Sequence, residues 1–477
     1  MCRKTVLFLI LFAPLFSLAQ GSGSFERWQS VSLADNKIGH RWLNIEYRER
    51  QVVSHQVLEI ETKVPGEPVR KSTITLEYIE TLSGEPVAIN KKVESESANY
   101  LMQARVAGAV LKVKLKSGGK VKSERFAIPD NFIMPRGLQK RLLAHKGNDK
   151  QLEYSNWSFS KMGFEKNHIT WREERLTGYS SVHWRIDKRK ENILEPTVLY
   201  ADEQFTVLRE VSRVTGKDFV IETCDKACAL SAAIPLKNVY SQLVRSPYRI
   251  PDAVLKRRIR YTLRSDYPLS LPQTFEQKVR VTPEGVQVEV CSDCGAESAP
   301  APLELENALQ NSFWLDYTDA ALQKQLGKLF SDPLPPAEKV MTRLETFVSR
   351  HMKKGPVNYS GYAPASEAFK SRSGDCTEQA LLLAAMGRAA GVPTRVAVGL
   401  AYSNERFYGR SHVFVPHAWV QAWVGDKWKS FDSGMEGFTS GHIALGLSDG
   451  EQGKYMEIMQ QLHALEISSA AQLKTKK

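Results

Sequence analysis

The spacing of apolar residues divides this chain of 477 residues into two kinds of folding unit. From residue 25 to residue 200, apolar and polar residues alternate, most regularly in the run Leu-Lys-Val-Lys-Leu-Lys at 111–116, which is followed by the turn pair Gly118–Gly119. A period of two residues is typical of strands that bury one face. Residues 20–201 are therefore predicted to form an antiparallel β-rich domain, either a sandwich or a curved sheet.

A second β-rich domain is predicted over residues 202–302. Two strand-like runs at 279–281 and 286–290 flank a turn, and an Ala- and Pro-rich linker follows at 298–302. Beyond the linker the period becomes helical, with Val340, Leu344 and Phe347 three and four positions apart. The predicted fold is multidomain, with N-terminal antiparallel β-rich domains followed by a C-terminal α+β domain at 303–477. The length of the chain also favours several domains.

The first 19 residues have the features of a secretory signal peptide. Arg3 and Lys4 precede an apolar run from 6 to 18, and Ser17 and Ala19 supply the small residues of a cleavage site. The alternative is an uncleaved single-span anchor, but the run is short for a bilayer crossing. We therefore expect cleavage after Ala19 and a periplasmic or secreted protein.

Charge gives a general indication of partners. Lysine and arginine exceed the acidic residues, for a formal net charge of +12, and loss of Arg3 and Lys4 with the signal peptide would leave +10. This excess favours an anionic envelope polymer or a membrane surface as partner, although a generally basic soluble protein is the alternative. No dense Lys/Arg run is interleaved with aromatic residues, so nucleic acid is not an expected partner.

Cysteine usage agrees with export. Without Cys2, four of the five remaining cysteines form two close pairs, which are predicted to be disulfides of open connectivity in an oxidising compartment. The alternative is one zinc site built from all four thiolates. The two pairs are Cys224 with Cys228 and Cys291 with Cys294, and Cys376 is left unpaired.

Cys376 is predicted to begin a buried helix. Asp375, followed three residues later by Glu378, matches a capping box, and residues 381–390 are apolar nearly all round before a stop at Gly391. The free N–H groups and the dipole at a helix start stabilise a thiolate, and the same N–H groups can donate to an oxyanion beside the sulfur. A cysteine here is a candidate nucleophile.

A hairpin supplies a base for this thiol. Strand-like residues 417–424 and 427–432 flank Gly425–Asp426, and pairing about this turn places Trp419 opposite Asp432. His417 is two residues before Trp419, so it shares a sheet face with Asp432 as a diagonal neighbour, within side-chain reach. Asp432 could therefore orient one imidazole nitrogen while the other serves Cys376.

These segments together resemble the transglutaminase-like core of the papain-like cysteine enzymes. The resemblance covers about residues 303–450 and implies a Cys-His-Asp triad of Cys376, His417 and Asp432. No calcium-loop or metal-ligand pattern stands out in this segment, so no cofactor and no metal ligand are expected. The matching blocks occur in the family's order: Gly374-Asp375-Cys376-Thr377-Glu378, Ala390-Gly391-Val392-Pro393-Thr394-Arg395, His417-Ala418-Trp419 and Trp428 through Phe431-Asp432.

Two positions depart from the family pattern. Ser433 stands where the family often has proline, and no upstream side chain can be identified as an oxyanion donor, so the N–H of Cys376 is the one donor assigned. The resemblance implies amide acyl transfer on a protein or peptide of the cell envelope, through a thioester that passes to water or to an amine. The alternatives are a non-catalytic envelope binding or assembly protein on the same scaffold and a zinc-dependent module at the paired cysteines.

Overall fold

The computed structural model describes most of the chain from Ser24 to Leu473. The described ranges are 24–62, 69–95, 99–117, 120–146, 151–191, 193, 195–214, 217–234, 243–354, 363–405, 411–435 and 437–473. The predicted signal peptide and the turn pair Gly118–Gly119 lie outside them.

In these ranges the N-terminal half forms one 14-stranded antiparallel sheet in the order β8-β7-β6-β5-β4-β3-β2-β1-β14-β13-β12-β11-β10-β9. Its strands are β1 (Ser24–Leu33), β2 (Asn36–Tyr47), β3 (Gln51–Thr62), β4 (Arg70–Thr81), β5 (Pro86–Glu94), β6 (Asn99–Ala107), β7 (Val110–Ser117), β8 (Lys120–Ala127), β9 (Gln151–Ser158), β10 (Gly163–Glu173), β11 (Trp184–Lys190), β12 (Thr197–Ala201), β13 (Val207–Val214) and β14 (Lys217–Cys224), with helices α1 (Pro135–Ala144) and α2 (Lys226–Leu230).

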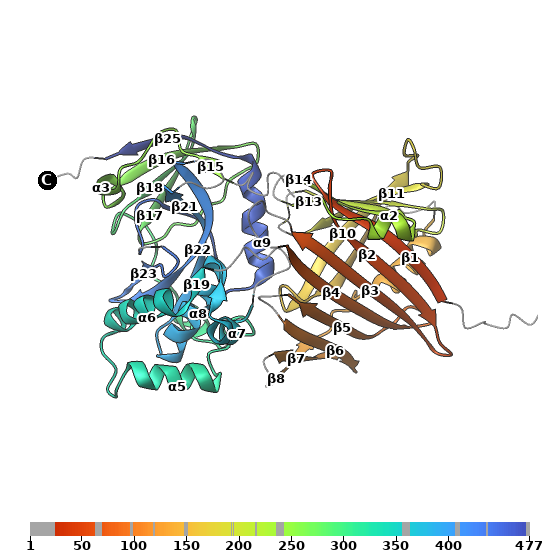
Figure 1. The fold of residues 1–477 in the computed structure, drawn as a ribbon, viewed down its shortest axis with the longest axis horizontal. Helices are drawn as coiled ribbons and strands as arrows, with labels where there is room; N and C mark the ends of the chain where they lie inside the picture. Colours follow the sequence, from red (N-terminus) through yellow and green to blue (C-terminus); the bar gives the residue numbers. More distant parts are fainter. Residues whose placement is uncertain are drawn as a thin grey trace, which may run out of the picture.

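The predicted alternation holds where it was clearest. In β7, Leu111, Val113 and Leu115 are buried, while the intervening lysines are exposed. The predicted domain boundary after residue 201 falls inside this sheet, because β13 pairs with β12 and β14 pairs with β1. The curved-sheet alternative describes the observed form, since the 14-stranded sheet is strongly curved in Figure 1.

The C-terminal half mixes helices with two further sheets. Its helices are α3 (Asp252–Leu255), α4 (Pro302–Asn307), α5 (Ala320–Leu329), α6 (Ala337–His351), α7 (Ala365–Ser371), α8 (Cys376–Ala389) and α9 (Gln452–Gln460), with a 3-10 turn at Gln461–Ala464. Its strands are β15 (Val244–Arg245), β16 (Ile259–Ser265), β17 (Gln277–Thr282), β18 (Gly285–Val290), β19 (Lys353–Lys354), β20 (Ser373–Gly374), β21 (Thr394–Ser403), β22 (Val413–Val424), β23 (Lys427–Phe431), β24 (His442–Ser448) and β25 (Leu465–Gln472). The predicted fold class, β-rich and then α+β, is confirmed.

Helix α8 forms the centre of the C-terminal core. Residues 377–388 are all buried, and the helix packs against β21 and β22 on one side and α6 and α7 on the other. The sheet beneath it has the order β15-β22-β21-β24, with β23 paired to β22. A helix without a polar face must be enclosed on all sides, which fixes its first residue relative to the strands around it.

Residues 259–290 do not form a separate domain with the strands before them. Their strands belong to a four-stranded sheet of order β17-β18-β16-β25, whose last member comes from the C-terminus. The buried Gln277 side chain also bridges to this region, donating to the Ala444 carbonyl at 2.9 Å and accepting from the Ala444 N–H at 2.9 Å. The segment predicted as a second domain is thus divided between the two halves of the molecule.

The two halves pack against each other. Helix α9 stands between them in Figure 1, and Lys161 of the N-terminal half pairs with Glu457 of this helix at 2.6 Å. Tyr100 meets Phe313 edge-on, with ring centroids 5.8 Å apart.

Both cysteine pairs are disulfides, Cys224 with Cys228 and Cys291 with Cys294. Thiols held in disulfides cannot also serve as a four-thiolate zinc site, so that alternative is wrong. Cys376 is the free cysteine of the described residues. Within the described ranges, no helix has the length and apolar character to span a membrane.

Candidate active site

Cys376 is the first residue of α8, as predicted. The Asp375 carboxylate accepts the Thr377 N–H at 2.7 Å, and the Glu378 carboxylate accepts the Asp375 N–H at 2.9 Å, which completes the capping box. The cysteine side chain remains partly exposed, unlike the residues that follow it. The cap therefore fixes the helix start and leaves the thiol accessible.

His417 and Asp432 meet across the β22–β23 hairpin. The register pairs Trp423 with Trp428 and Gln421 with Ser430, as the sequence predicted. His417 Nε2 lies 2.8 Å from Asp432 Oδ2, and these side chains are 4% and 1% exposed. Because Nε2 is engaged by the carboxylate, Nδ1 is the ring nitrogen left to face another partner.

The electrostatics favour a charged imidazole. Burial lowers the pKa of His417, but the charge and hydrogen bond of Asp432, together with a hydrogen bond and charge from Cys376, outweigh it and raise the pKa to about 10. Burial alone would raise the pKa of Asp432, yet His417 and His442 hold it far below its ordinary value. The thiol, imidazole and carboxylate thus interact as one chain of groups.

A second histidine, His442, also holds the carboxylate. His442 Nε2 is 2.9 Å from Asp432 Oδ2, and the ring is 2% exposed. Asp432 Oδ1 accepts the backbone N–H groups of Gly434 at 2.8 Å and Met435 at 3.3 Å. Both carboxylate oxygens are therefore satisfied by converging donors, a condition under which a buried charge is tolerated.

The turn after Asp432 forms without the family's proline. Ser433 is buried within it. A Cβ built on Gly434 would lie 3.2 Å from His417 Cε1 and 3.4 Å from Asp432 Oδ1. The turn therefore packs directly against the ring of His417, and a side chain at 434 would need the ring to give by a few tenths of an ångström.

Two glutamates, the half-buried Glu345 and the buried Glu276, support the hairpin from behind. Glu345 of α6 accepts the Asp432 N–H at 2.6 Å. Glu276 accepts the Ser430 N–H at 3.0 Å, while the Ser430 hydroxyl donates to Glu276 and accepts from Trp419 Nε1 at 3.2 Å. Burial is the largest cause that raises the pKa of each glutamate to about 7.

Tyr455 of α9 lies near the start of α8. Burial raises its pKa well above the ordinary value, and the negative charges of Cys376 and Asp375 raise it further, while a hydrogen bond with the Thr377 side chain lowers it. Helix α9 thus brings a phenol close to the thiol.

Sequence reasoning missed His442, Glu345, Glu276 and Tyr455. β24, which begins at His442, pairs with β21, and no local turn connects these strands, so side-chain parity could not place His442 beside Asp432. The only sequence signal was a histidine at a strand start after the Gly-containing turn 437–441.

His417, Asp432 and His442 also form the type of group that can ligate a metal, with one ligand atom from each within 4.8 Å of the others. The Nε2–Oδ2 separations of 2.8 and 2.9 Å are lengths of charge-assisted hydrogen bonds. With Oδ1 taken by backbone N–H groups, the observed contacts describe a hydrogen-bonded chain.

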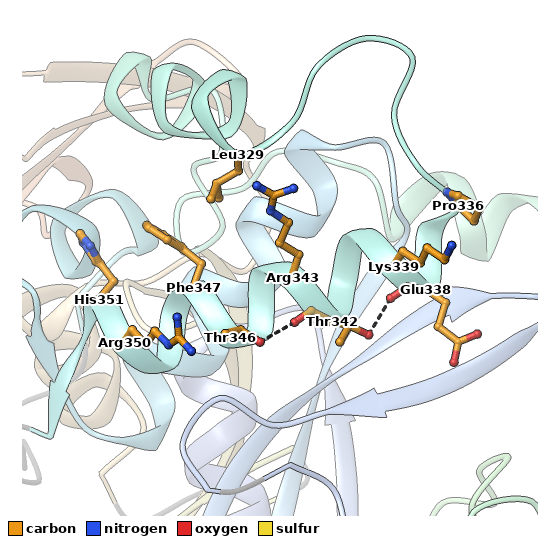
Figure 2. A pocket seen from close by; sticks show the side chains of 10 residues that line it. All are labelled: Leu329, Pro336, Glu338, Lys339, Thr342, Arg343, Thr346, Phe347, Arg350 and His351. Atoms are coloured by element: carbon orange, nitrogen blue, oxygen red, sulfur yellow. Dashed lines mark hydrogen bonds between the residues drawn. The ribbon is translucent and has the colours of Figure 1, made fainter.

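A separate groove of about 920 Å³ runs along the outer side of α6. Figure 2 shows its lining side chains, among them Arg343, Phe347 and Arg350, and the Thr346–Thr342 hydrogen bond along the helix. None of Cys376, His417 and Asp432 lines this groove. The inner side of α6 instead carries Glu345 to the site.

The C-terminal half therefore has an α+β fold with a free thiol at a buried helix start beside an imidazole–carboxylate pair. Residues 324–433 match the model of the Transglutaminase-like superfamily, so this part of the chain is a transglutaminase-like domain. The match includes Cys376, His417 and Asp432 and ends one residue past the aspartate.

Comparisons with solved structures give low TM-scores. A candidate cysteine protease from Cytophaga hutchinsonii has 15% identity and a TM-score of 0.29, covering 47% of this chain and 88% of that one. The periplasmic domain of TgpA from Pseudomonas aeruginosa has 16% identity and a TM-score of 0.26, covering 62% and 91%. A β-barrel-like protein of the domain of unknown function DUF1849 from Brucella abortus has 8% identity and a TM-score of 0.34, covering 42% and 95%.

At these scores the overlaps establish neither fold nor activity. A search of curated protein sequences finds no match.

Proposed function

We propose that this chain is an exported cysteine enzyme that transfers the acyl group of an amide, acting on protein or peptide substrates of the cell envelope. The observation that carries the proposal is the His417 imidazole, which interacts electrostatically with the free thiol of Cys376 and lies 2.8 Å from the buried Asp432. A thiol at a capped helix start, with an imidazole whose other nitrogen is held by a carboxylate, has the arrangement of an activated nucleophile.

In the first step, the Cys376 thiolate attacks the amide carbonyl carbon, and a carbon–sulfur bond forms as the carbonyl π electrons move to oxygen. The N–H of Cys376 at the start of α8 can donate to that oxyanion. When the carbon–nitrogen bond breaks, His417 gives its proton to the departing amine. The products are a thioester on Cys376, a free amine and a neutral imidazole.

In the second step, water or an amine attacks the thioester while His417 removes its proton. The thiolate departs, and the imidazolium–thiolate pair is restored. Water gives a peptidase or deamidase, whereas a lysine-type amine gives a cross-link. Against the effect of burial, the pKa of His417 is raised to about 10 mainly by Asp432, which keeps the imidazole charged over the whole neutral range.

Location outside the cytoplasm belongs to the same proposal. Two disulfides and one free cysteine in the described residues suit an oxidising compartment. The predicted signal peptide at 1–19 is the sequence basis for export.

Alkylation tests whether Cys376 is an activated nucleophile. The mature chain 20–477 is treated with iodoacetamide at pH 6, and labelling is located by peptide mass spectrometry. We expect Cys376 to react at least about tenfold faster than free cysteine, because its thiolate is paired with an imidazolium. In His417→Ala the rate should fall to that of an ordinary thiol. A folded wild type whose Cys376 reacts no faster than free cysteine would favour the non-catalytic scaffold.

The acyl acceptor is identified by incubating envelope fractions with wild type and with Cys376→Ala. New peptide termini indicate hydrolysis of peptide bonds, conversion of glutamine to glutamate indicates deamidation, and glutamine–lysine isopeptides indicate cross-linking. If none of the three differs between the two proteins, the assignment to envelope substrates is wrong. Addition of a chelator to wild type should leave the products unchanged.

A further inference from the structure

The N-terminal sheet encloses a cavity of about 690 Å³. Its walls come from strands far apart in the sheet order, for example Ile89 of β5 and Ile186 of β11, and from α1, which contributes Leu142. The curvature visible in Figure 1 therefore brings the two arms of the sheet to face one interior space. Its volume lies within the range of small-molecule sites.

Much of the cavity wall is apolar. Side chains such as Ile169, Trp157 and Phe205 line it, and most of them also belong to the buried cores of the half. An interior that was only a folding core would be filled to high density, with few voids larger than a water molecule. The observed volume is far larger than such a void, so a ligand with an apolar body fits it.

The charged side chains of the cavity are not balanced. Seven lysines and arginines line it, against four glutamates. Each glutamate is taken by a cation of the same wall: Arg41 pairs with Glu210 at 3.2 Å and Lys190 with Glu165 at 3.0 Å, for example. Lys161 and Arg213 pair with the remaining glutamates, Glu457 and Glu195.

Three cavity cations have no carboxylate within 4 Å in the described part of the chain: Arg27 of β1, Arg136 of α1 and Lys188 of β11. Arg27 donates to the Val207 carbonyl at 2.7 Å, and Arg136 donates to Tyr47 and Gln139 while its Nε is buried without a partner.

Lys188 is the least satisfied of the three. Its ammonium group lies over the ring of Tyr154, whose centroid is 5.9 Å from Nζ. Burial lowers its pKa, and the charges of Glu210 and Glu165 offset this only in part. The side chain is half-buried, and an ammonium group drawn partly out of water without a hydrogen-bonded counterion favours an anion from outside as its partner.

We propose that this cavity binds an acidic amphiphile, with a carboxylate or phosphate head group paired to Lys188 and an apolar tail against the aliphatic and aromatic wall. The excess of cations selects the sign of the head group, and the apolar lining selects the tail. The proposal concerns the N-terminal half and does not depend on catalysis at Cys376.

Displacement of a fluorescent fatty acid tests the proposal. Mature Cys376→Ala protein, which removes turnover, is loaded with cis-parinaric acid below micelle-forming concentrations and titrated with oleate, oleoyl lysophosphatidate and monoolein. We expect both acids to displace the probe and neutral monoolein to bind at least about tenfold more weakly. The two acids distinguish a carboxylate head from a phosphate head.

Two substitutions on the same strand give a matched comparison. Lys188→Gln should weaken binding of the acids at least about tenfold, because it removes the charge that pairs with the head group, and should leave monoolein binding unchanged. Arg189→Gln makes the same charge change on the opposite, exposed face of β11 and should alter binding less than twofold.

The proposal is overturned if neutral and acidic amphiphiles bind equally, if Arg189→Gln weakens binding as much as Lys188→Gln, or if no amphiphile displaces the probe. Displacement by an apolar peptide with no displacement by either acid would assign the cavity to peptides instead. Thermal unfolding of both variants checks the fold, and Lys188→Gln should unfold no lower than wild type because it removes a half-buried charge that has no carboxylate partner among the described residues.

Discussion

Two charged groups, one in each half of this molecule, differ in how far the fold itself satisfies them. In the C-terminal half, Asp432 is 1% exposed and accepts hydrogen bonds from two imidazoles and two backbone N–H groups. In the N-terminal half, Lys188 lines a cavity and has no carboxylate within 4 Å among the described residues, while the ring centroid of Tyr154 lies 5.9 Å from Nζ. One charge is surrounded by partners from its own chain, and the other is not.

The difference shows what each half is prepared for. A charge already satisfied by the fold holds its neighbours in position before any substrate arrives, which is the condition for preorganised catalysis. A charge that the fold leaves without a counterion reduces stability until a ligand supplies one. Under the two proposals, the C-terminal half carries the chemistry and the N-terminal half binds a ligand.

The largest expected effect is at the nucleophile. Cys376→Ala should lower activity at least about ten-thousandfold, because no other described thiol can form the thioester. Turnover of the substrate found by mass spectrometry measures the loss, and an unchanged unfolding midpoint shows that the fold is intact. Residual activity within tenfold of wild type would place the chemistry at another residue.

Asp432→Asn should reduce activity about a hundred- to a thousandfold and also destabilise the protein by about 1–3 kcal/mol. An amide has one acceptor oxygen, so its NH₂ group must face either the two imidazole Nε2 atoms or the N–H groups of Gly434 and Met435. Activity assays and urea unfolding measure the two effects. A variant as stable as wild type would show that the four donors do not all converge on Asp432.

His442 should behave as a positioning residue for Asp432. His442→Leu removes one donor to the carboxylate, and we expect kcat to fall about tenfold with little change in KM. Because the His442 hydrogen bond lowers the pKa of Asp432, its loss should also move the acid limb of the activity profile to higher pH.

His442→Gln keeps an N–H donor at a similar reach and should restore most of the activity and the original acid limb. If the glutamine and leucine variants behave alike, His442 acts only by filling space.

A smaller effect concerns the pH dependence of stability. Burial raises the pKa of Glu345 to about 7, so the folded state keeps a proton that the unfolded chain releases above its ordinary pKa of 4.5. This group therefore lowers the free energy of unfolding as pH rises from about 4.5 to 7. Glu345→Gln keeps an acceptor for the Asp432 N–H. After allowance for partial solvent screening, it should remove about 1–2 kcal/mol of the pH-dependent fall in the free energy of unfolding.

Urea unfolding at several pH values between 4.5 and 8 measures this slope. Glu338→Gln on the same helix is the control, because the exposed Glu338 pairs with Lys429 and its pKa is lowered rather than raised. The idea is wrong if both variants change the slope in the same direction.

The smallest expected effect is on the stability of the ligand-free protein and concerns Lys188. Lys188→Met keeps the length of the side chain and removes its charge, so the ligand-free protein should gain about 1 kcal/mol in unfolding free energy. A matched Arg189→Met change on the exposed face should leave it within a few tenths. A loss of stability in Lys188→Met would mean that the fold already stabilises the ammonium group. Lys188 would then not differ from Asp432 in this respect.

The sequence by itself determined features that depend on near neighbours along the chain. The capping box of Asp375 and Glu378, the register of Gln421 with Ser430 and the alternation of β7 are all set within a few residues, so periodicity and turn chemistry predict them. The contact of His417 with Asp432 followed from that register.

Only the tertiary structure decided the features that join distant segments. β24 brings His442 to Asp432 and α6 brings Glu345, and neither pairing has a local signal in the sequence. The curvature of the 14-stranded sheet is also a property of the whole sheet, and it alone turns Lys188 and its neighbours into the wall of a cavity. Alternation shows which face of a strand is buried, but the partner of that face, or the space left beside it, depends on strands far away in the chain.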